Sequence, residues 1–321
     1  MRTETAPAVQ PEIVALTLNP AVDVSYEVDR LVPDQKNHAT SARYDPGGNG
    51  INVARALKEL MVPAHSCCVA AGQVGGLLQR LLEHALDDSR CVTVAGETRI
   101  NATILQGQPP VQYEVTGIGP YVSPVALAEV REQVLRLAAS GYAVLTGSLP
   151  PGVPDNFYGE LMEALHRQGA RTVLDAHGPA MDFALRQAPF LIKPNAYELS
   201  MLSGRELPRL EDVAEAARGL QGKGVHYVCV SLGAQGALLV GPEGSFFAKA
   251  PKISVRSTVG AGDSMVGGLV AAFSRGYREE ECLRLGVACG SGTAAEPGTA
   301  IFSRNGISHL LRGVEVASLD I

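Results

Sequence analysis

Residues 142–175, YAVLTGSLPPGVPDNFYGELMEALHRQGARTVLD, decide the fold. The runs 142–146 and 172–175 are short and apolar, and residues 157–167 between them have the pattern of a helix. Continuous apolar strands that are joined by a helix are typical of a parallel sheet with both faces covered. This stretch therefore predicts one strand–helix–strand unit of an α/β fold.

The same alternation extends on both sides of this unit. The expected elements are a strand at 13–18, a helix from about 52, a helix near 125–139, a strand at 190–192, helices near 196–202 and 211–220, and a strand at 227–230. The turn sequence GPEG at 241–244 lies between two strand-like runs and predicts a late hairpin. Apolar helices are expected at about 263–274 and 281–294.

Two segments, 24–44 and 92–118, do not fit this alternation. Both contain strand-like runs without helices between them. We therefore expect them to form a small sheet that projects from the main domain. The main domain would then consist of residues 12–23, 45–91 and 119–315.

The composition excludes several classes of protein. The chain has 321 residues, a net charge of -6 and 46% hydrophobic residues, so it lacks the basic surface that nucleic-acid binding requires. Its six cysteines form no C-x-x-C pair and its histidines no H-x-x-x-H pair, which favours buried thiols over a zinc site. Residues 1–11 lack the apolar stretch of a signal peptide, and no run approaches the roughly 20 apolar residues of a membrane span. The expected compartment is the cytosol.

The stretch TVGAGDS, residues 258–264, is the strongest local motif. It follows a strand-like run and begins an apolar helix, where small residues allow close approach and the first amides are free donors. Such a helix start suits an anion, and Asp263 could take a proton from a hydroxyl that attacks a phosphate held there. An Asp that only caps the helix explains the same spacing equally well.

A second glycine-rich loop, PGGNGIN at residues 46–52, also begins a helix. It does not match G-x-G-x-x-G, because Val53 stands where the third glycine should be, and no G-x-x-x-x-G-K-[ST] occurs in the chain. Asn49 and Asn52 could bind sugar hydroxyls, although turn and cap roles explain them as well.

Three more loops follow predicted strands. In KPNAYE, residues 193–198, Asn195 and Glu198 share a helical face and suit either a helix cap or a nucleotide and Mg²⁺–water site. The loops 146–152 and 231–236 are rich in small residues. Because ligands of open α/β sheets bind beyond the carboxyl ends of the strands, the loops together predict an anion-binding enzyme of phosphoryl transfer.

Four segments resemble the PfkB/ribokinase family, and the resemblance extends over about residues 13–315. They are PGGNGINVARAL at 46–57, KPNAYEL at 193–199, SLGAQGALLV at 231–240 and STVGAGDSMVGG at 257–268. The resemblance implies a three-layer α/β/α fold with a mostly parallel sheet, a small β lid, and transfer of phosphate from ATP to a sugar. Within the family the sequence is similar to the minor bacterial 6-phosphofructokinases, the 1-phosphofructokinases and the tagatose-6-phosphate kinases.

The same resemblance implies roles for individual residues. Asp263 would be the catalytic base, beside an anion hole of Gly260, Ala261 and Gly262. The substrate would contact Asp23, Lys36, Gly48, Asn49, Gly50, Asn52, Arg99, Asn101 and Ser148, with Lys36 and Arg99 converging on its phosphate. ATP would contact Lys193, Asn195, Ser231, Gly233 and Gly236. Glu198 would order Mg²⁺ through water, and whether K⁺ is also required stays open.

The expected reaction is phosphorylation of fructose 6-phosphate to fructose 1,6-bisphosphate by ATP. Other expectations remain open: a 1-phosphofructokinase, a tagatose-6-phosphate kinase, a kinase of an unphosphorylated sugar or nucleoside, or a non-catalytic regulator that binds a sugar phosphate. We expect a homodimer that forms through the lid, because a small sheet with an open apolar face is poorly stable alone.

Overall fold

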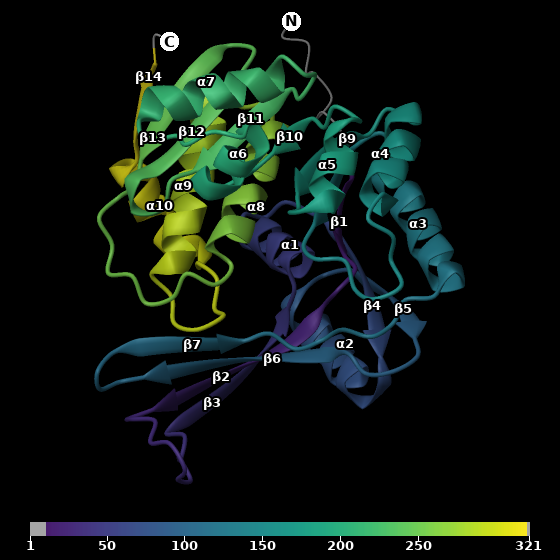
Figure 1. Cartoon of the computed structure of the whole chain (residues 1–321), viewed down its shortest axis with the longest axis vertical. Coiled ribbons are helices and arrows are strands. Elements are labelled where there is room, and N and C mark those ends of the chain that lie inside the picture. Colours follow the sequence, from purple (N-terminus) through teal and green to yellow (C-terminus); the bar gives the residue numbers. More distant parts are fainter. Residues whose placement is uncertain (1–10, 320–321) are drawn as a thin grey trace, which may run out of the picture.

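The computed structural model describes residues 11–319, so all but the last residue of the leader 1–11 lies outside the described part. The main domain is built on a ten-stranded sheet (Figure 1). In spatial order its strands are β14 (Glu315–Ser318), β13 (Gly244–Lys249), β12 (Gly236–Gly241), β11 (Tyr227–Ser231), β10 (Leu191–Ile192), β9 (Arg171–Asp175), β8 (Tyr142–Thr146), β1 (Ile13–Thr17), β4 (His65–Ala71) and β5 (Ser89–Val94).

Helices cover both faces of this sheet. Alternate residues of a strand face opposite sides, and here both sets are apolar, so each face has to be buried. In β1, Ile13 and Ala15 belong to one hydrophobic cluster, while Val14 and Leu16 belong to the other. The first face is packed by α1 (Asn49–Glu59), α2 (Gly72–Ala85), α8 (Ala261–Ser274), α9 (Glu279–Ala294) and α10 (Arg304–Gly313). The second is packed by α3 (Pro124–Ala138), α4 (Phe157–Arg167), α5 (Pro179–Leu185), α6 (Ala196–Ser203) and α7 (Leu210–Gln221). The predicted three-layer α/β fold is confirmed.

The sheet has one point where its strand order reverses. Strands β5, β4, β1, β8, β9, β10 and β11 pair in parallel, whereas β12, β13 and β14 are antiparallel. The chain continues from β1 to β4 on one side, and β8 pairs with the other side of β1. Loops that leave β1 and β8 therefore lie at the switch point where α/β proteins bind ligands.

A four-stranded lid projects from the main domain (Figure 1). Its strands, in spatial order, are β3 (Ser41–Gly47), β2 (Ala21–Val28), β6 (Arg99–Gln106) and β7 (Val111–Val115). The second lid segment begins later than the expected residue 92, because β5 pairs with β4 in the large sheet and buries Val92 and Val94 there. The lid also begins earlier than residue 24, since β2 starts at Ala21.

The other expected elements of the main domain agree with the structure. The helix expected at 157–167 is α4, and the late hairpin is formed by β12 and β13 around a turn at 241–244. Helices α2, α5 and α10 were not expected. All six cysteines are free thiols, five of them buried. Among residues 11–319, no helix is long and apolar enough to span a membrane.

Candidate active site

The start of α8, from Gly260 to Asp263, forms the part of the candidate site that we call the floor. Gly260, the N-cap, has a φ of 73°, a left-handed conformation that favours glycine. The amide of Ala261 donates a long hydrogen bond of 3.4 Å to the Thr258 carbonyl, while in the described chain the amides of Gly262 and Asp263 have no acceptor. The Gly260 amide likewise has no acceptor in the described chain, so the predicted anion hole keeps free donors at Gly260 and Gly262, and Asp263 adds one more.

Two amides of α1 hold the Asp263 carboxylate. Asn49 Nδ2 donates to Oδ1 at 2.8 Å, and Asn52 Nδ2 donates to Oδ2 at 2.9 Å. The two asparagines are three residues apart, so they lie on one face of the helix that opens after the PGGNG loop. Sequence reasoning assigned both to the sugar, whereas the structure shows that both amides contact Asp263.

The electrostatics of Asp263 suit a general base. The side chain is buried, which raises its pKa to about 6 against the lowering effect of the Asn52 and Asn49 amides. A carboxylate with this pKa is mostly ionised at neutral pH, yet it is more basic than an exposed aspartate.

A buried ion pair borders the floor at the carboxyl ends of β9 and β10. Lys193 Nζ lies 3.3 Å from Asp175 Oδ2, and 3.3 Å from the position that a Cβ on Gly262 would take. Burial opposes the charge of Lys193, but Asp175 and Asp263 together raise its pKa above the usual value. Sequence reasoning missed Asp175, although its place at the end of a predicted parallel strand was a signal.

The nucleotide segments lie beyond the same strand ends. Residue Asn195 bridges to Ser231 at the end of β11, Gly233 lies in the connection from β11 to β12, and Gly236 is the first residue of β12. Asn195 and Glu198 form a reciprocal cap of α6: each side chain accepts a hydrogen bond of 2.8 Å from the other's amide. The described residues contain no cluster of three or more His, Cys, Asp or Glu side chains that could hold a metal.

The root of the lid contributes a second polar cluster. Asn101 Nδ2 donates to Asp23 Oδ1 at 2.8 Å, joining β6 to β2. Arg99 donates to the Asn19 carbonyl at 2.7 Å, and the Asn19 amide donates to Ser148 Oγ at 3.0 Å. Asn19 and Ser148 follow β1 and β8, so this cluster lies at the switch point of the sheet. Sequence reasoning missed Asn19 as a site residue.

This cluster has unused polar atoms. The Asn19 Oδ1 and Arg99 Nε atoms are buried without a hydrogen-bond partner. Buried polar atoms without partners are costly, so they indicate a place for a polar ligand or for water.

Two predicted contacts of the substrate differ from expectation. Gly50 is buried against β1, and a Cβ there would lie 2.4 Å from the Leu16 carbonyl oxygen, so its role is packing rather than contact with a sugar. Gly48 is the N-cap of α1, and its contact with the substrate stays a prediction. Lys36 lies in the exposed connection between β2 and β3. This connection is at the end of the lid far from the main domain (Figure 1).

The expected convergence of Lys36 and Arg99 on one phosphate is wrong within a single chain. Arg99 pairs with Ala21 at the inner end of β2, and the connection that carries Lys36 leaves the outer end at Val28. The eight residues of β2 at about 3.3 Å each separate these ends by more than about 20 Å.

Known proteins are similar to this chain in both sequence and fold. The chain is 35% identical over 309 residues to a 1-phosphofructokinase of Bacillus subtilis, covering 96% of this chain and all of the relative. It is 36% identical over 295 residues to the ATP-dependent 6-phosphofructokinase isozyme 2 of Escherichia coli, covering 91% and 96%. The structure of Escherichia coli phosphofructokinase-2 in complex with fructose-6-phosphate superposes with a TM-score of 0.89 at 33% identity, covering 95% of this chain and 99% of that one.

The model of the family described as pfkB family carbohydrate kinase matches residues 13–305. That match includes the floor, the root of the lid and the nucleotide segments. The chain belongs to the pfkB family of carbohydrate kinases.

Proposed function

We propose that this protein transfers the γ-phosphoryl group of ATP to a hydroxyl of a hexose phosphate, with fructose 6-phosphate as acceptor and fructose 1,6-bisphosphate as product. The observation that carries the proposal is the buried Asp263 carboxylate, held by two amides next to free helix-start donors. Relatives named 1-phosphofructokinase and 6-phosphofructokinase both support a fructose phosphate as acceptor.

Each part of the floor has a task in this reaction. Asp263 accepts the proton of the attacking hydroxyl, and its pKa of about 6 keeps it ionised at neutral pH. The amides of Gly262 and Asp263 and the ammonium of Lys193 face the place where negative charge develops on the transferred phosphoryl group. The polar cluster of Asp23, Asn101 and Arg99 at the root of the lid binds the sugar phosphate.

ATP and Mg²⁺ are the proposed cofactors. The chemistry of the donors fits them, because Lys193 offers a cation to phosphate and the carboxylates of Asp175 and Glu198 offer hard oxygen atoms to Mg²⁺ or to its waters. Bound Mg²⁺ would neutralise phosphate charge. One solved relative, Escherichia coli phosphofructokinase-2, is described in complex with potassium. Replacing K⁺ by tetramethylammonium in the assay tests whether this enzyme needs it.

Alternatives within the family differ in the acceptor. A 1-phosphofructokinase would act on fructose 1-phosphate, and a tagatose-6-phosphate kinase on the epimeric sugar phosphate. Fructose 1-phosphate and fructose 6-phosphate give the same bisphosphate, so the product alone does not separate them. A non-catalytic sugar-phosphate-binding regulator is disfavoured because the base and its two amide partners are all present.

Release of ADP, measured with each acceptor in turn, tests the proposal. The panel contains fructose 6-phosphate, fructose 1-phosphate, tagatose 6-phosphate and free fructose. We expect the highest kcat/KM with fructose 6-phosphate and the lowest with fructose. A preference for another phosphosugar would change the acceptor, and no ADP release above the ATPase background with any acceptor would overturn the enzyme assignment.

We also propose that two copies associate through the lid. The register of the lid puts Tyr44, Val115 and Tyr113 on the face opposite to Asp23 and Asn101, and all three are exposed. An exposed apolar sheet face of this kind favours burial against a second copy. A solved relative, Escherichia coli phosphofructokinase-2, is described as tetrameric in its inhibited form. In such an assembly Lys36 could contact a substrate phosphate only in the site of the second copy.

Light scattering at assay concentration tests the association. A species of about 34 kDa alone, the mass of one chain, would contradict it.

A further inference from the structure

A buried arginine continues the row of side chains that leads to the catalytic carboxylate. Arg55 lies three residues after Asn52 in α1, on the same side of the helix, and is only 9% exposed. Its Nη1 donates to Asn52 Oδ1 at 3.1 Å and to the Thr299 carbonyl at 3.4 Å. The chain Arg55–Asn52–Asp263 is therefore continuous from the interior to the floor.

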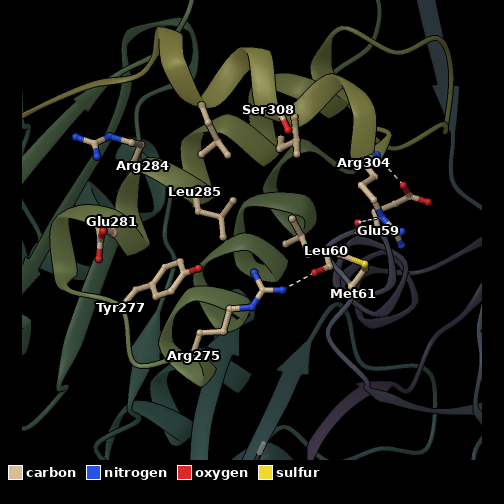
Figure 2. A pocket seen from close by; sticks show the side chains of 12 residues that line it. Glu59, Leu60, Met61, Arg275, Tyr277, Glu281, Arg284, Leu285, Arg304 and Ser308 are labelled. Atoms are coloured by element: carbon tan, nitrogen blue, oxygen red, sulfur yellow. Dashed lines mark hydrogen bonds between the residues drawn. The ribbon is translucent and has the colours of Figure 1, made fainter.

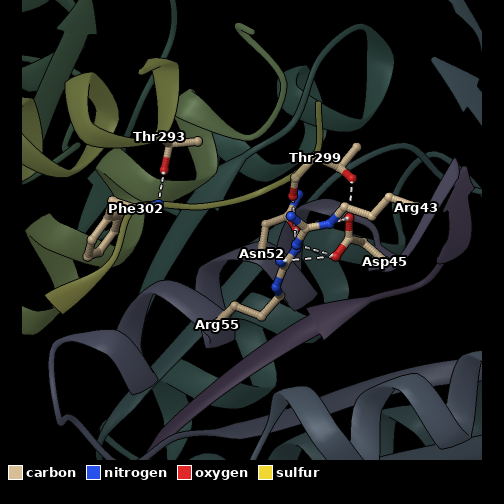
Figure 3. Close-up of polar contacts among 7 residues, drawn as sticks. All are labelled: Arg43, Asp45, Asn52, Arg55, Thr293, Thr299 and Phe302. Atoms are coloured by element: carbon tan, nitrogen blue, oxygen red, sulfur yellow. Dashed lines mark hydrogen bonds and ion pairs between the residues drawn. The ribbon is translucent and has the colours of Figure 1, made fainter. Parts of the chain in front are cut away.

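Three further side chains lie around Arg55, at the end of this row that is away from Asp263 (Figure 3). Asp45 of β3 lies 3.8 Å from Arg55, accepts two hydrogen bonds from Arg43, and accepts one of 2.6 Å from the Thr299 hydroxyl. Arg55 is thus fixed by a lid strand on one side and by the loop before α10 on the other. This setting leaves the guanidinium little freedom to turn away from Asn52.

The chemistry of the neighbours permits only one orientation of the Asn52 amide. A guanidinium can only donate hydrogen bonds, and an ionised carboxylate can only accept them. Asn52 satisfies both neighbours only when its oxygen faces Arg55 and its nitrogen faces Asp263. The opposite orientation would place an amide oxygen against the carboxylate and N–H groups against the guanidinium.

We propose that Arg55 is a positioning residue, which locks the Asn52 amide in the one orientation that presents an N–H donor to the Asp263 carboxylate. Arg55 touches none of the reacting groups and acts through Asn52. The inference rests on the proposed role of Asp263 as the base, and it adds a residue that neither the motif nor the family match assigns.

The lock has a measurable consequence in the pH dependence of catalysis. An amide donor favours the ionised form of Asp263, so losing the donor raises the pKa of the base. A lost hydrogen bond to a charged group corresponds to about one pH unit or more. The charged groups that face Asp263 from other elements are Asp175 at the end of β9 and Lys193 after β10, and both stay unchanged in the variants below.

Arg55 itself faces several charges. They are Asp45 and Arg43 of β3, Asp23 of β2 and Glu59 of α1. Removing the positive charge of Arg55 could therefore alter the base through space as well as through the amide. The experiment has to separate these two routes.

The experiment compares kcat/KM against pH, from about pH 5 to 9, for wild type, R55M, R55K, N52L and the double variant N52L/R55M. We expect R55M to move the acid limb upward by about one pH unit, with kcat/KM on the high-pH plateau within about threefold of wild type. R55K keeps a donor towards Asn52 and should leave the limb near its wild-type position. In the N52L background, R55M should cause no further shift, because the amide that Arg55 locks is gone.

Two outcomes would overturn the proposal. A uniform loss of kcat/KM at every pH in R55M would make Arg55 a structural residue only. A shift of equal size in wild-type and N52L backgrounds would mean that its charge acts through space. If R55M does not fold, R55Q replaces it, because glutamine keeps a polar partner for Asp45 and accepts either orientation of Asn52. If folded R55Q then showed the acid limb of its pH profile at the wild-type position, this would contradict the proposed role of Arg55 in orienting the Asn52 amide.

The test also separates this inference from the proposed function. Absent kinase activity in the wild type would refute the function itself. An active wild type whose acid limb does not respond to Arg55 substitutions would refute only the lock.

Discussion

The floor of the site and the lid differ in how completely their polar groups are partnered. On the floor, both oxygens of Asp263 accept hydrogen bonds, and Arg55 fixes one of the two donors. At the root of the lid, the Arg99 Nε and Asn19 Oδ1 atoms are buried without partners. Farther out, the lid exposes apolar side chains on one face and Lys36 at its tip.

This difference indicates a division of labour. In the proposed reaction, a prearranged floor would supply the base and the anion donors without reorganisation. The lid would instead offer unused polar groups to a substrate and an unpartnered face to a second copy. Changes on the floor should therefore lower the rate of chemistry, while changes in the lid should alter acceptor binding and assembly.

A groove at the carboxyl ends of α1 and α8 provides a third kind of surface. Figure 2 shows Arg275, Arg284 and Arg304 around it, together with Leu60 and Leu285. All three arginines already have partners: Arg275 donates to the Leu60 carbonyl, Arg284 pairs with Glu280, and Arg304 Nε donates to the Glu59 carbonyl. The groove has the partnered charges of a structural surface rather than the unused ones of the lid root.

The largest effect is expected on the floor. D263N should lower kcat by at least about 10²-fold, because the amide cannot accept the proton of the attacking hydroxyl. ATP affinity should stay near the wild-type value. D182N, which changes an exposed aspartate of α5, is the matched control and should leave kcat unchanged. Near-wild-type turnover of D263N would contradict the role of Asp263 as the base.

The next effect concerns the root of the lid. R99A should lower kcat/KM for fructose 6-phosphate by about one to two decades, since a charge-assisted hydrogen bond contributes roughly 1.5–3 kcal/mol. Free fructose offers no phosphate to Arg99 and should lose little. Equal losses for both sugars would indicate that Arg99 supports the lid through the Asn19 carbonyl instead of binding phosphate.

A third variant addresses the apolar face of the lid. Y113D places a charge at a position that is 43% exposed, on the face that we assign to the second copy. We expect a shift from dimer to monomer in light scattering, because burying an unpaired charge is costly. V125D changes a side chain on α3 that is 80% exposed and should leave the assembly intact. An unchanged dimer in Y113D would place the interface elsewhere.

The smallest effect is expected at the Glu198 cap. E198Q should raise the Mg²⁺ concentration needed for half-maximal rate several-fold, while an amide oxygen can still cap α6. D212N changes the equivalent capping residue of α7 and is the control. The same Mg²⁺ titration in wild type and E198Q would reduce Glu198 to a helix cap.

The sequence was sufficient for the repeating part of the fold, because strand–helix alternation is a local pattern. It predicted α4 to the residue, but it misassigned β5 to the lid, since a short apolar strand does not show which sheet it joins. The motifs located Asp263 correctly at a helix start. They did not show that Asn52, 211 residues away, donates to it, because such a contact exists only in the folded chain.

The reach of Lys36 could not be predicted for a similar reason. A resemblance aligns a residue along the chain, but the length of β2 decides how far it lies from Arg99. Asp175 could have been predicted as a site residue, because it ends a predicted parallel strand. In the structure it lies beside Lys193.

If Asp263 is the base, the acid limb of the pH profile depends on the pKa of its carboxyl group. Burial gives Asp263 a pKa of about 6 in the free protein, so kcat/KM should fall about tenfold per pH unit below this value as the carboxyl group takes up a proton. Phosphate groups also titrate near pH 6, so the limb has to be assigned with a variant. N52L removes a donor from Asp263 and should move the limb upward by about one pH unit, whereas titration of the substrate would stay in place. A limb at the same pH in wild type and N52L would contradict the account.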